Sequence, residues 1–375
     1  MFSFIPLYEY THYFNLFILF LVLLAFYQSS RAIIFTQSNE RLNAAWGCFV
    51  AVAIILYMGY RNPTSSVFGD TVNYTHGFWK EAASNVPFKW TWDGEWLFYN
   101  LMRFFAHHSD VTTFYLFCAT VYVGCLWIAM VRMFGRHYYI PFLVILSMFF
   151  FWAYGVNGIR NGMGASLFIL ALTYVDKLPI AVLLCFLAVG CHKSTFIMIA
   201  AAGLAWFVKN SYIYLSAWIL SVIASYFSGF TIQFWIARLN LTSGDDRLAD
   251  YLTKTDASEI LRTEGAIVQI GFRWDFLLFS AIAVGVGYYF IFRRKFQDEY
   301  YHWIYNIYLI TNAFWVLVIR ASYSNRFAQI SWFIMPLVLI YPFMKQRFWK
   351  NHERMTGFAL LLFYAFTFYS NILKG

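Results

Sequence analysis

The chain has 375 residues, of which 61% are hydrophobic, 23% are aromatic and 12% are charged. Because soluble domains carry about 25% charged residues, this composition excludes an ordinary water-soluble globular protein. The formal net charge of +9 does not indicate a nucleic-acid-binding protein, since the basic residues stand in the gaps between apolar segments. The five cysteines lie in or beside apolar segments without metal-ligand spacing, so we expect neither a disulfide framework nor a metal site.

Apolar segments close to the ~20 residues that span a bilayer recur along the whole chain. We therefore predict a single all-α, polytopic integral membrane domain over residues 1–375, with about twelve transmembrane helices. The residues before the first apolar segment include Glu9 but no Lys or Arg. They therefore lack the basic region of a cleaved signal peptide, which favours a retained helix. The predicted spans are residues 12–28, 43–60, 112–131, 139–154, 162–175, 178–191, 194–208, 212–236, 273–292, 300–319, 328–344 and 356–372.

The orientation follows from the basic residues, because short loops rich in Lys and Arg stay in the cytoplasm. Alternate gaps hold Arg31, Arg41, Arg132, Arg136, Lys177, Lys209, Arg293, Arg294, Lys295, Lys345, Arg347, Lys350 and Arg354. This pattern places both termini on the outer side, together with two longer polar loops at about residues 61–111 and 238–272. Each loop is expected to carry a short amphipathic helix.

Ionisable residues near membrane depth are candidate functional residues, because they are costly to keep there. The first candidate segment follows the second span and contains Arg61, Gly69, Asp70 and Tyr74. Gly69 permits a tight turn, Asp70 can accept a proton or a hydrogen bond, and Tyr74 offers an amphipathic edge. The alternative is a solvated loop in which Asp70 caps the next helix.

The second candidate segment, residues 155–165, has four glycines among its eleven residues. Each glycine costs a helix about 1 kcal/mol relative to Ala, so the pattern predicts a broken or re-entrant helix. Arg160, followed by Asn161, stands at its centre, where a planar guanidinium beside free backbone N–H groups suits a phosphate. The alternative is a structural arginine that donates to carbonyls released by the break.

The third candidate segment is the polar interruption His192, Lys193 and Ser194 between two apolar segments. Histidine is the natural general base near neutral pH, although a lone histidine is often a hydrogen-bonded structural residue. The fourth segment holds Arg320 and Arg326 between the tenth and eleventh predicted spans. Snorkelling toward lipid headgroups is the alternative for either arginine.

These segments share one predicted membrane face and show no opposing run of buried acids. Such a surplus of fixed cations indicates an anionic ligand that arrives from the lipid, and polyprenyl-diphosphate-linked sugars are anions of that kind.

The same residues resemble the EpsG-like branch of the Wzy-type polysaccharide polymerases. The resemblance covers most of the chain in order, although the long outer loop with paired arginine motifs of other O-antigen polymerases and ligases is missing. It rests on Arg61, Gly69-Asp70, Tyr74, Arg160 with Ala165, His192-Lys193-Ser194, and Arg326 ahead of the apolar segment 327–339.

The resemblance implies a metal-independent, cofactor-free glycosyltransferase at the outer face of the bacterial inner membrane. Such an enzyme joins undecaprenyl-diphosphate-linked oligosaccharide repeat units into O-antigen, capsule or exopolysaccharide. Its expected partners are that lipid-linked oligosaccharide, membrane lipid and a chain-length regulator protein, without nucleic acid.

We assign roles on chemical grounds within this interpretation. His192 is the expected catalytic base and Asp70 its reserve. The remaining candidates are diphosphate ligands (Arg160, Arg326, Arg320, Lys193) and substrate-binding residues (Arg61, Tyr74, Asn161). Sugars are expected to stack on Trp79, Trp90, Trp92 or Trp96, for which interfacial anchoring is the alternative.

Two other classes of function fit a chain of this kind. One is a transporter, either a flippase for the same lipid-linked units or a carrier for a small anion, because broken helices with glycine are common in transporters. Against it, the two halves of the sequence show no repeat, and the candidate residues gather at one face instead of the midplane. The other is a membrane O-acetyltransferase, for which the sequence shows no cytoplasmic acyl-donor site.

The predicted topology can be checked by cysteine accessibility. Cysteines introduced at positions 85 and 255 should react with a membrane-impermeant thiol reagent in intact spheroplasts. Cysteines at positions 134 and 351 should react only after lysis. The opposite labelling pattern would invert the orientation and remove the candidate residues from the outer face.

Overall fold

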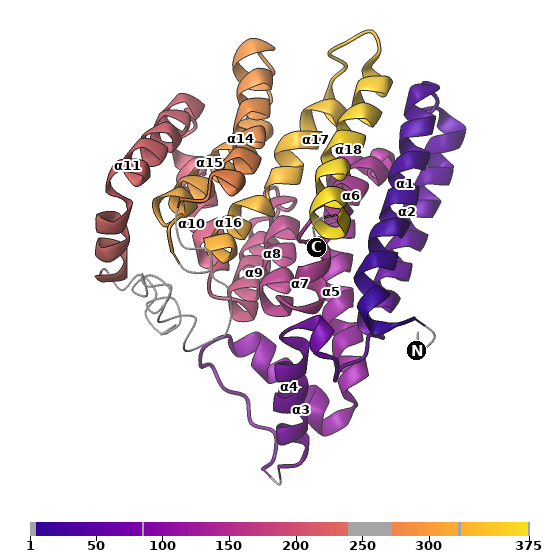
Figure 1. The fold of residues 1–375 in the computed structure, drawn as a ribbon, viewed down its shortest axis with the longest axis vertical. Coiled ribbons are helices and arrows are strands. Elements are labelled where there is room, and N and C mark those ends of the chain that lie inside the picture. Colours follow the sequence, from indigo (N-terminus) through magenta and orange to yellow (C-terminus); the bar gives the residue numbers. More distant parts are fainter. Residues whose placement is uncertain (1–4, 85, 239–271, 322–323, 374–375) are drawn as a thin grey trace. The chain divides into compact units, whose positions relative to one another are not determined.

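The computed structural model describes residues 5–84, 86–238, 272–321 and 324–373 (Figure 1). Every regular element in these ranges is a helix, which confirms the predicted all-helical class. The chain divides into two compact units, which are described separately below. The first contains residues 1–195 and 343–375, and the second contains residues 196–342. The amphipathic helix predicted for residues 238–272 falls almost wholly outside the described ranges.

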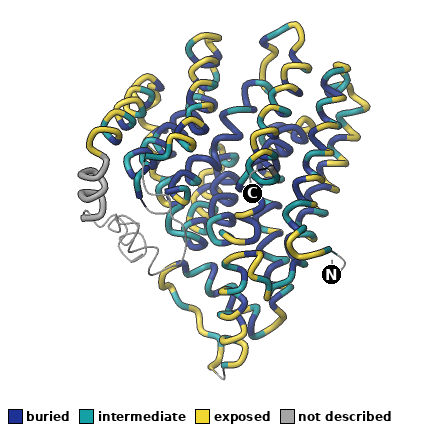
Figure 2. The backbone as a smooth tube through the Cα atoms, viewed as in Figure 1, coloured by how far each residue is buried: buried dark blue, intermediate teal, exposed yellow. Residues whose placement is uncertain are grey.

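The first unit combines long helices with a group of short ones. Its α6 and α8 are buried along nearly their whole length, whereas α1, α2 and α18 each expose one face (Figure 2). The α3 and α4 helices lie beyond the end of α2 and beside the start of α5, in the segment predicted as a long polar loop (Figure 1). The helices are α1 Tyr10–Ser30, α2 Gln37–Gly59, α3 Thr71–Ala82, α4 Trp96–His108, α5 Val111–Phe134, α6 Tyr139–Leu146, α7 Phe151–Val156, α8 Ile159–Leu172, α9 Leu178–Cys191 and α18 His352–Phe368.

The second unit is organised around α15, whose buried tyrosines donate hydrogen bonds to carbonyls of neighbouring helices. Tyr301 donates to the Val338 carbonyl at 2.9 Å, and Tyr308 donates to the Ser280 carbonyl at 2.7 Å. These bonds satisfy polar groups that would be costly to bury alone. The helices are α10 Thr195–Phe207, α11 Ser211–Arg238, α14 Trp274–Tyr288, α15 Glu299–Leu317, α16 Ser324–Trp332 and α17 Met335–Lys345.

Seven helical segments among the described residues are long and apolar enough to cross a membrane. They are Leu7–Ser30, Gln37–Gly59, Val111–His137, Ser211–Ser228, Trp274–Arg293, Ser324–Lys345 and His352–Ile372. Five predicted spans, at residues 139–154, 162–175, 178–191, 194–208 and 300–319, correspond to shorter or more polar helices. The predicted total of about twelve spans is therefore not confirmed.

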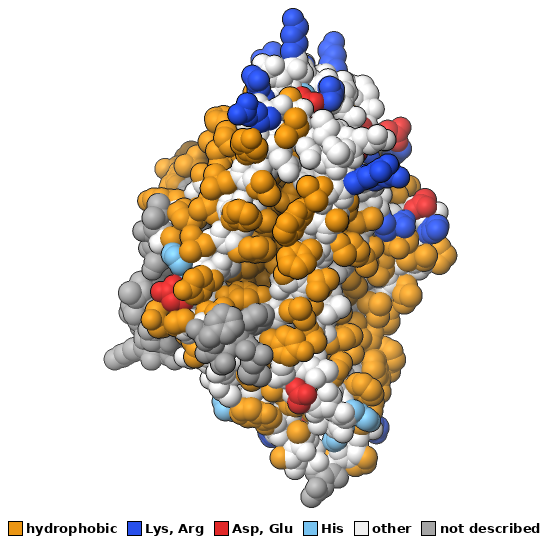
Figure 3. All heavy atoms as spheres, turned by 90° about the vertical axis from the view of Figure 1, so that its right-hand side faces the viewer, with side chains coloured by type: hydrophobic (Ala, Val, Ile, Leu, Met, Phe, Trp, Pro, Cys, Tyr) orange, Lys and Arg blue, Asp and Glu red, His pale blue; other side chains and the backbone are white. Residues whose placement is uncertain are grey.

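One face of the molecule shows the distribution expected of a membrane protein. Hydrophobic side chains cover its middle, and Lys and Arg side chains gather at one end (Figure 3). Such a band of apolar surface matches the hydrocarbon layer, while cations favour the headgroup region.

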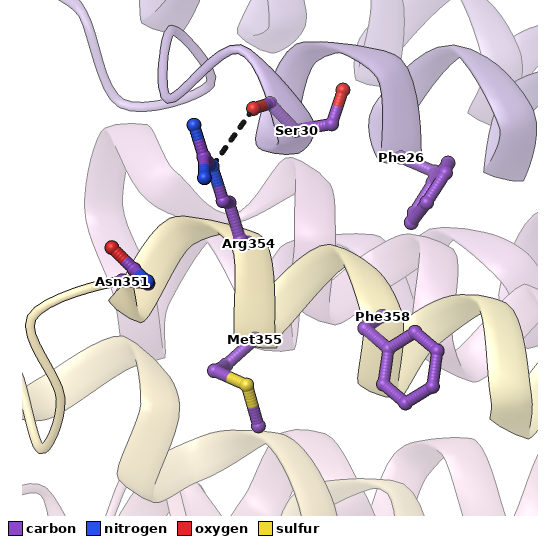
Figure 4. Close-up of a pocket in the computed structure, with 6 residues that line it drawn as sticks. All are labelled: Phe26, Ser30, Asn351, Arg354, Met355 and Phe358. Carbon is purple, nitrogen blue, oxygen red and sulfur yellow. Dashed lines mark hydrogen bonds between the residues drawn. The ribbon is translucent and has the colours of Figure 1, made fainter.

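Close packing of α1 against α18 joins the two ends of the chain within the first unit. A Cβ atom on Gly357 would lie 2.4 Å from Cβ of Ser29, so only glycine allows this approach. Nearby, Arg354 donates to the Ser30 carbonyl at 3.1 Å. An open pocket of about 410 Å³ lies here (Figure 4), lined by Phe26, Ser30, Asn351, Arg354, Met355 and Phe358.

We predict opposite effects for two glycine substitutions in this unit. Gly357→Ala should lower the thermal unfolding temperature in detergent, because overpacking costs about 1–3 kcal/mol. Gly124→Ala in α5 should be neutral or stabilising, since a Cβ there meets no atom within 4 Å and alanine favours the helix. Equal unfolding temperatures for the two variants would contradict the close approach of α1 and α18.

Candidate active site

The helix break predicted for residues 155–165 is present and is held by the segment that follows α2. The α7 helix ends at Val156, and α8 begins at Ile159. The Thr71 hydroxyl donates to the Val156 carbonyl, and Asn157 Oδ1 accepts from the Asp70 N–H at 2.8 Å. The first bond satisfies the Val156 carbonyl at the break, and the second satisfies the N–H of Asp70. They also place the start of α3 beside the start of α8.

Gly69 is required where these two segments meet. Its φ of 59° lies in the left-handed region, and a Cβ would lie 2.6 Å from the Asn157 side chain. Both the backbone conformation and the available space therefore exclude a side chain at this position. Asp70 follows directly, half-buried, and its Oδ1 accepts from Asn73 Nδ2 at 3.3 Å.

Arg160, in the first turn of α8, is engaged on two of its three nitrogens. Its Nε donates to the Tyr74 hydroxyl at 3.0 Å, and its Nη1 donates to the Tyr99 hydroxyl at 3.0 Å. The same Nη1 forms an ion pair with Glu95 Oε2. Nη2 makes no hydrogen bond to any residue in the described ranges. This nitrogen remains available to a ligand.

Glu95 is the residue of the site that sequence reasoning missed. It precedes α4 at the N-cap position, yet its side chain caps no backbone N–H. Instead, Oε2 pairs with Arg160, and Oε1 lies 3.0 Å from His192 Nδ1. Glu95 is only 7% exposed, so the carboxylate is compensated by these partners and not by water.

Burial alone would raise the pKa of Glu95, since it disfavours the charged form. Hydrogen bonds and electrostatic interactions with His192 and Arg160 outweigh this effect and hold the pKa of Glu95 below its usual value. Glu95 is therefore an ionised carboxylate at neutral pH.

His192 is oriented by this carboxylate. A carboxylate only accepts hydrogen bonds, so the 3.0 Å contact requires the hydrogen on Nδ1. The Ser194 N–H also faces Nδ1, at the longer distance of 3.3 Å, and cannot be accepted by a protonated nitrogen. In the neutral ring, Nε2 then carries the lone pair, and no described residue forms a hydrogen bond with it. This is the geometry of an oriented general base.

Two glycines allow the helices that carry these residues to approach each other. A Cβ on Gly164 of α8 would lie 2.7 Å from Thr195 Oγ1, just beyond His192. A Cβ on Gly190 of α9 would lie 2.6 Å from the Trp96 ring, and Trp96 follows Glu95. The contacts made possible at these glycines set the spacing between Arg160, Glu95 and His192.

The other predicted residues of the first unit surround this network. Tyr74 lies one turn after Asp70 on α3 and reaches Arg160. Asn161 Nδ2 donates to the Tyr154 hydroxyl at 3.3 Å, across the helix break. Lys193 follows His192 and is half-buried.

Arg61 lies beneath the segment that carries Asp70. It is 1% exposed, its Nη1 donates to the Met58 carbonyl at 2.7 Å, and its Nε donates to Thr71 Oγ1 at 3.1 Å. Its guanidinium carbon stands 4.1 Å from the centre of the Tyr115 ring. Arg61 thus ties the end of α2 to the start of α3, and its role in substrate binding stays a prediction.

Arg320 and Arg326 belong to the second unit. Arg320 is half-buried and donates to the Tyr226 carbonyl at 3.2 Å, while Arg326 is exposed on α16. Their proposed contact with a diphosphate stays a prediction.

One expectation about the charge of the site is wrong. The sequence indicated fixed cations without opposing buried acids, but both Arg160 and His192 pair with the buried Glu95. The error arose because Glu95 stands among polar loop residues, where a carboxylate is normally solvated. No group of three or more His, Cys, Asp and Glu side chains in the described part of the chain could hold a metal ion.

Apolar helices of membrane-spanning length and a buried network of Glu, Arg, His and Tyr define an integral membrane protein with a candidate catalytic site. The family model described as the EpsG family matches residues 44–375. The chain therefore belongs to the EpsG family of polysaccharide polymerases, which confirms the resemblance found from the sequence. No curated protein and no solved structure matches the chain.

Substitution of Glu95 should show the stability contributed by its ionised form. The folded-state pKa of Glu95 lies below its ordinary value of ~4.3, so the ionised form stabilises the fold above that pH. This stabilisation is lost as the pH falls through the folded-state pKa. Glu95→Gln should therefore lower the unfolding temperature at pH 7, since breaking a buried pair costs about 3–5 kcal/mol. The deficit should shrink near pH 4.

The exposed Asp93 supplies the control for this measurement. Asp93→Asn should leave stability within about 0.5 kcal/mol at either pH, as expected for an exposed site. A Glu95→Gln deficit that stays unchanged from pH 7 down to about pH 3, below the ordinary pKa of a Glu, would show that charge pairing is not its source.

Proposed function

We propose that this protein is a glycosyltransferase that polymerises polyprenyl-diphosphate-linked oligosaccharide repeat units. The work takes place at the outer face of the bacterial inner membrane, and the product is O-antigen, capsule or exopolysaccharide. Membership of the EpsG family supports the reaction class. The observation that carries the proposal is the ordered contact from Glu95 to His192 and Arg160.

In the proposed reaction, His192 activates a sugar hydroxyl of the acceptor. The lone pair of Nε2 takes the hydroxyl proton while the oxygen forms a bond to the anomeric carbon of the donor. The bond between that carbon and the carrier diphosphate breaks, and the diphosphate leaves with the electron pair. Glu95, 3.0 Å from Nδ1, stabilises the imidazolium that results.

Arg160 is the proposed ligand of the departing diphosphate through its available Nη2. Tyr74 adds a neutral donor beside it. The Tyr74 hydroxyl accepts from Arg160 Nε, so its own hydrogen is free to point toward a phosphate oxygen. Burial raises the pKa of Tyr74 to about 12, which keeps this hydrogen in place at neutral pH.

The charge of the network supports this order of events. Ionised Glu95 balances Arg160, and in the proposed reaction His192 starts as the neutral base. Transfer of the acceptor proton to His192 leaves the network with one added positive charge. That charge arises as negative charge develops on the leaving diphosphate, so its stabilising effect is stronger in the transition state than in the ground state.

A polymerisation assay tests these roles. Purified variants in liposomes would receive diphosphate-linked oligosaccharide extracted from the host strain, and gels would report the polymer ladder. His192→Ala should reduce turnover by about 100- to 10,000-fold. Glu95→Gln should impair turnover, and Arg160→Lys should fail despite its charge because it lacks the guanidinium fork.

His107→Ala is the matched control. His107 also contacts a carboxylate, Glu81 at 3.5 Å, but it lies near the opposite end of α4 from Glu95, roughly 18 Å along the helix. The His107→Ala variant should polymerise the oligosaccharide normally. If His192→Ala keeps more than about a tenth of normal turnover, His192 is not the base. Asp70→Asn is then the next variant.

A further inference from the structure

Three tryptophans and a phenylalanine form one aromatic cluster beside the candidate active site. The ring centroids of Trp92 and Trp96 are 4.8 Å apart, and those of Trp90 and Trp92 are 5.7 Å apart. Phe186 of α9 continues the cluster, 5.0 Å from Trp96. Trp79, the fourth tryptophan of this segment, contacts His76 and has no ring contact with the cluster. We call Trp90, Trp92, Trp96 and Phe186 the aromatic platform.

The backbone that carries the platform is held in place by α4. The Thr91 N–H donates to Asn100 Oδ1 at 3.1 Å, and Asn100 Nδ2 donates to the Thr91 carbonyl at 2.6 Å. Arg103 Nη1 donates to Thr91 Oγ1 at 2.8 Å. These bonds fix the residue between Trp90 and Trp92, so both rings are positioned before any ligand arrives. Such preorganisation lowers the entropy cost of binding.

Folding leaves the platform open. Trp92 is 65% exposed, Trp90 is 40% exposed and Phe186 is 50% exposed. Large aromatic side chains held rigidly yet left uncovered are typical of binding surfaces. Trp90 and Trp92 precede α4 and therefore lie outside the helices that are long enough to span a membrane.

The platform is continuous with the candidate active site at two points. Trp96 follows Glu95 directly, and its ring lies against Gly190, two residues before His192. A molecule that covers Trp92 and Trp96 therefore lies next to the segments that carry Glu95 and His192.

We propose that the aromatic platform is a saccharide subsite, on which a pyranose ring of the glycan stacks. A pyranose has an apolar face of C–H groups, which suits the face of an indole ring, and a rim of hydroxyls. Asp93 directly follows Trp92 and is exposed, so its carboxylate is an acceptor that such hydroxyls can use. An acyl chain would offer the Asp93 carboxylate no hydrogen-bond donor. The inference rests on the proposed function, because it assigns part of the same substrate.

Steady-state kinetics with the extracted lipid-linked oligosaccharide tests the subsite. Trp92→Ala should raise KM by about 2- to 10-fold at unchanged kcat, the signature of lost ground-state binding. Trp92→Phe should restore KM to within about twofold, since a phenyl ring still stacks. Phe104→Ala, a substitution of an exposed aromatic residue of α4 outside the platform, should match the wild type. An unchanged KM in Trp92→Ala would overturn the inference.

Fluorescence separates this subsite from interfacial anchoring, even if Trp92→Ala folds poorly. The difference in emission between the wild type and Trp92→Phe gives the fluorescence of Trp92 alone. This difference is measured in liposomes with ordinary acyl chains and in liposomes with brominated acyl chains. We expect the fluorescence of Trp92 to be insensitive to the brominated chains and to be quenched by aqueous iodide. Quenching by bromine would make Trp92 a membrane anchor and overturn the subsite. If the wild type makes no polymer, the proposed function fails. If it polymerises while KM in Trp92→Ala is unchanged, only the subsite fails.

Discussion

The carboxylate of Glu95 joins three segments of the first unit through its contacts with Arg160 and His192. Charged groups removed from water must be paired, and loss of one partner leaves the others uncompensated. The position of α4 is therefore coupled to α8 and to the end of α9. Tyr74 and Tyr99 extend the same coupling to Arg160 by hydrogen bonds of 3.0 Å. The network thus serves folding and chemistry with the same contacts.

The site also requires close approach of the helix backbones, because short polar contacts form only between helices that nearly touch. Gly164 and Gly190 leave no room for a Cβ atom, and Gly69 adopts a backbone conformation that few other residues tolerate. The break between α7 and α8 then frees the Val156 carbonyl, which Thr71 satisfies, and it presents Asn157 to the Asp70 N–H. The glycines that would weaken a continuous helix are thus the residues that let the site assemble.

The helical class and the helix break follow from periodicity and glycine content, which are local signals. Glu95 does not, since its partners are 65 positions away at Arg160 and nearly a hundred at His192. A carboxylate before a helix ordinarily caps it, and only the fold shows that this one turns toward the cations. The number of spans stays unconfirmed, because the shorter apolar helices resemble the seven longer ones in composition.

The pairing of Arg160 with Glu95 affects how such a site would distinguish its substrate from other anions. An arginine already paired with a carboxylate attracts free phosphate less than an unpaired one, because the field of Glu95 opposes that of Arg160. In the proposed reaction, positive charge in excess appears only when His192 takes a proton from an acceptor hydroxyl. Tight binding of the diphosphate is thereby linked to the presence of both sugars, and the resting site does not hold its product strongly. Differential binding of this kind favours turnover over inhibition by the released carrier.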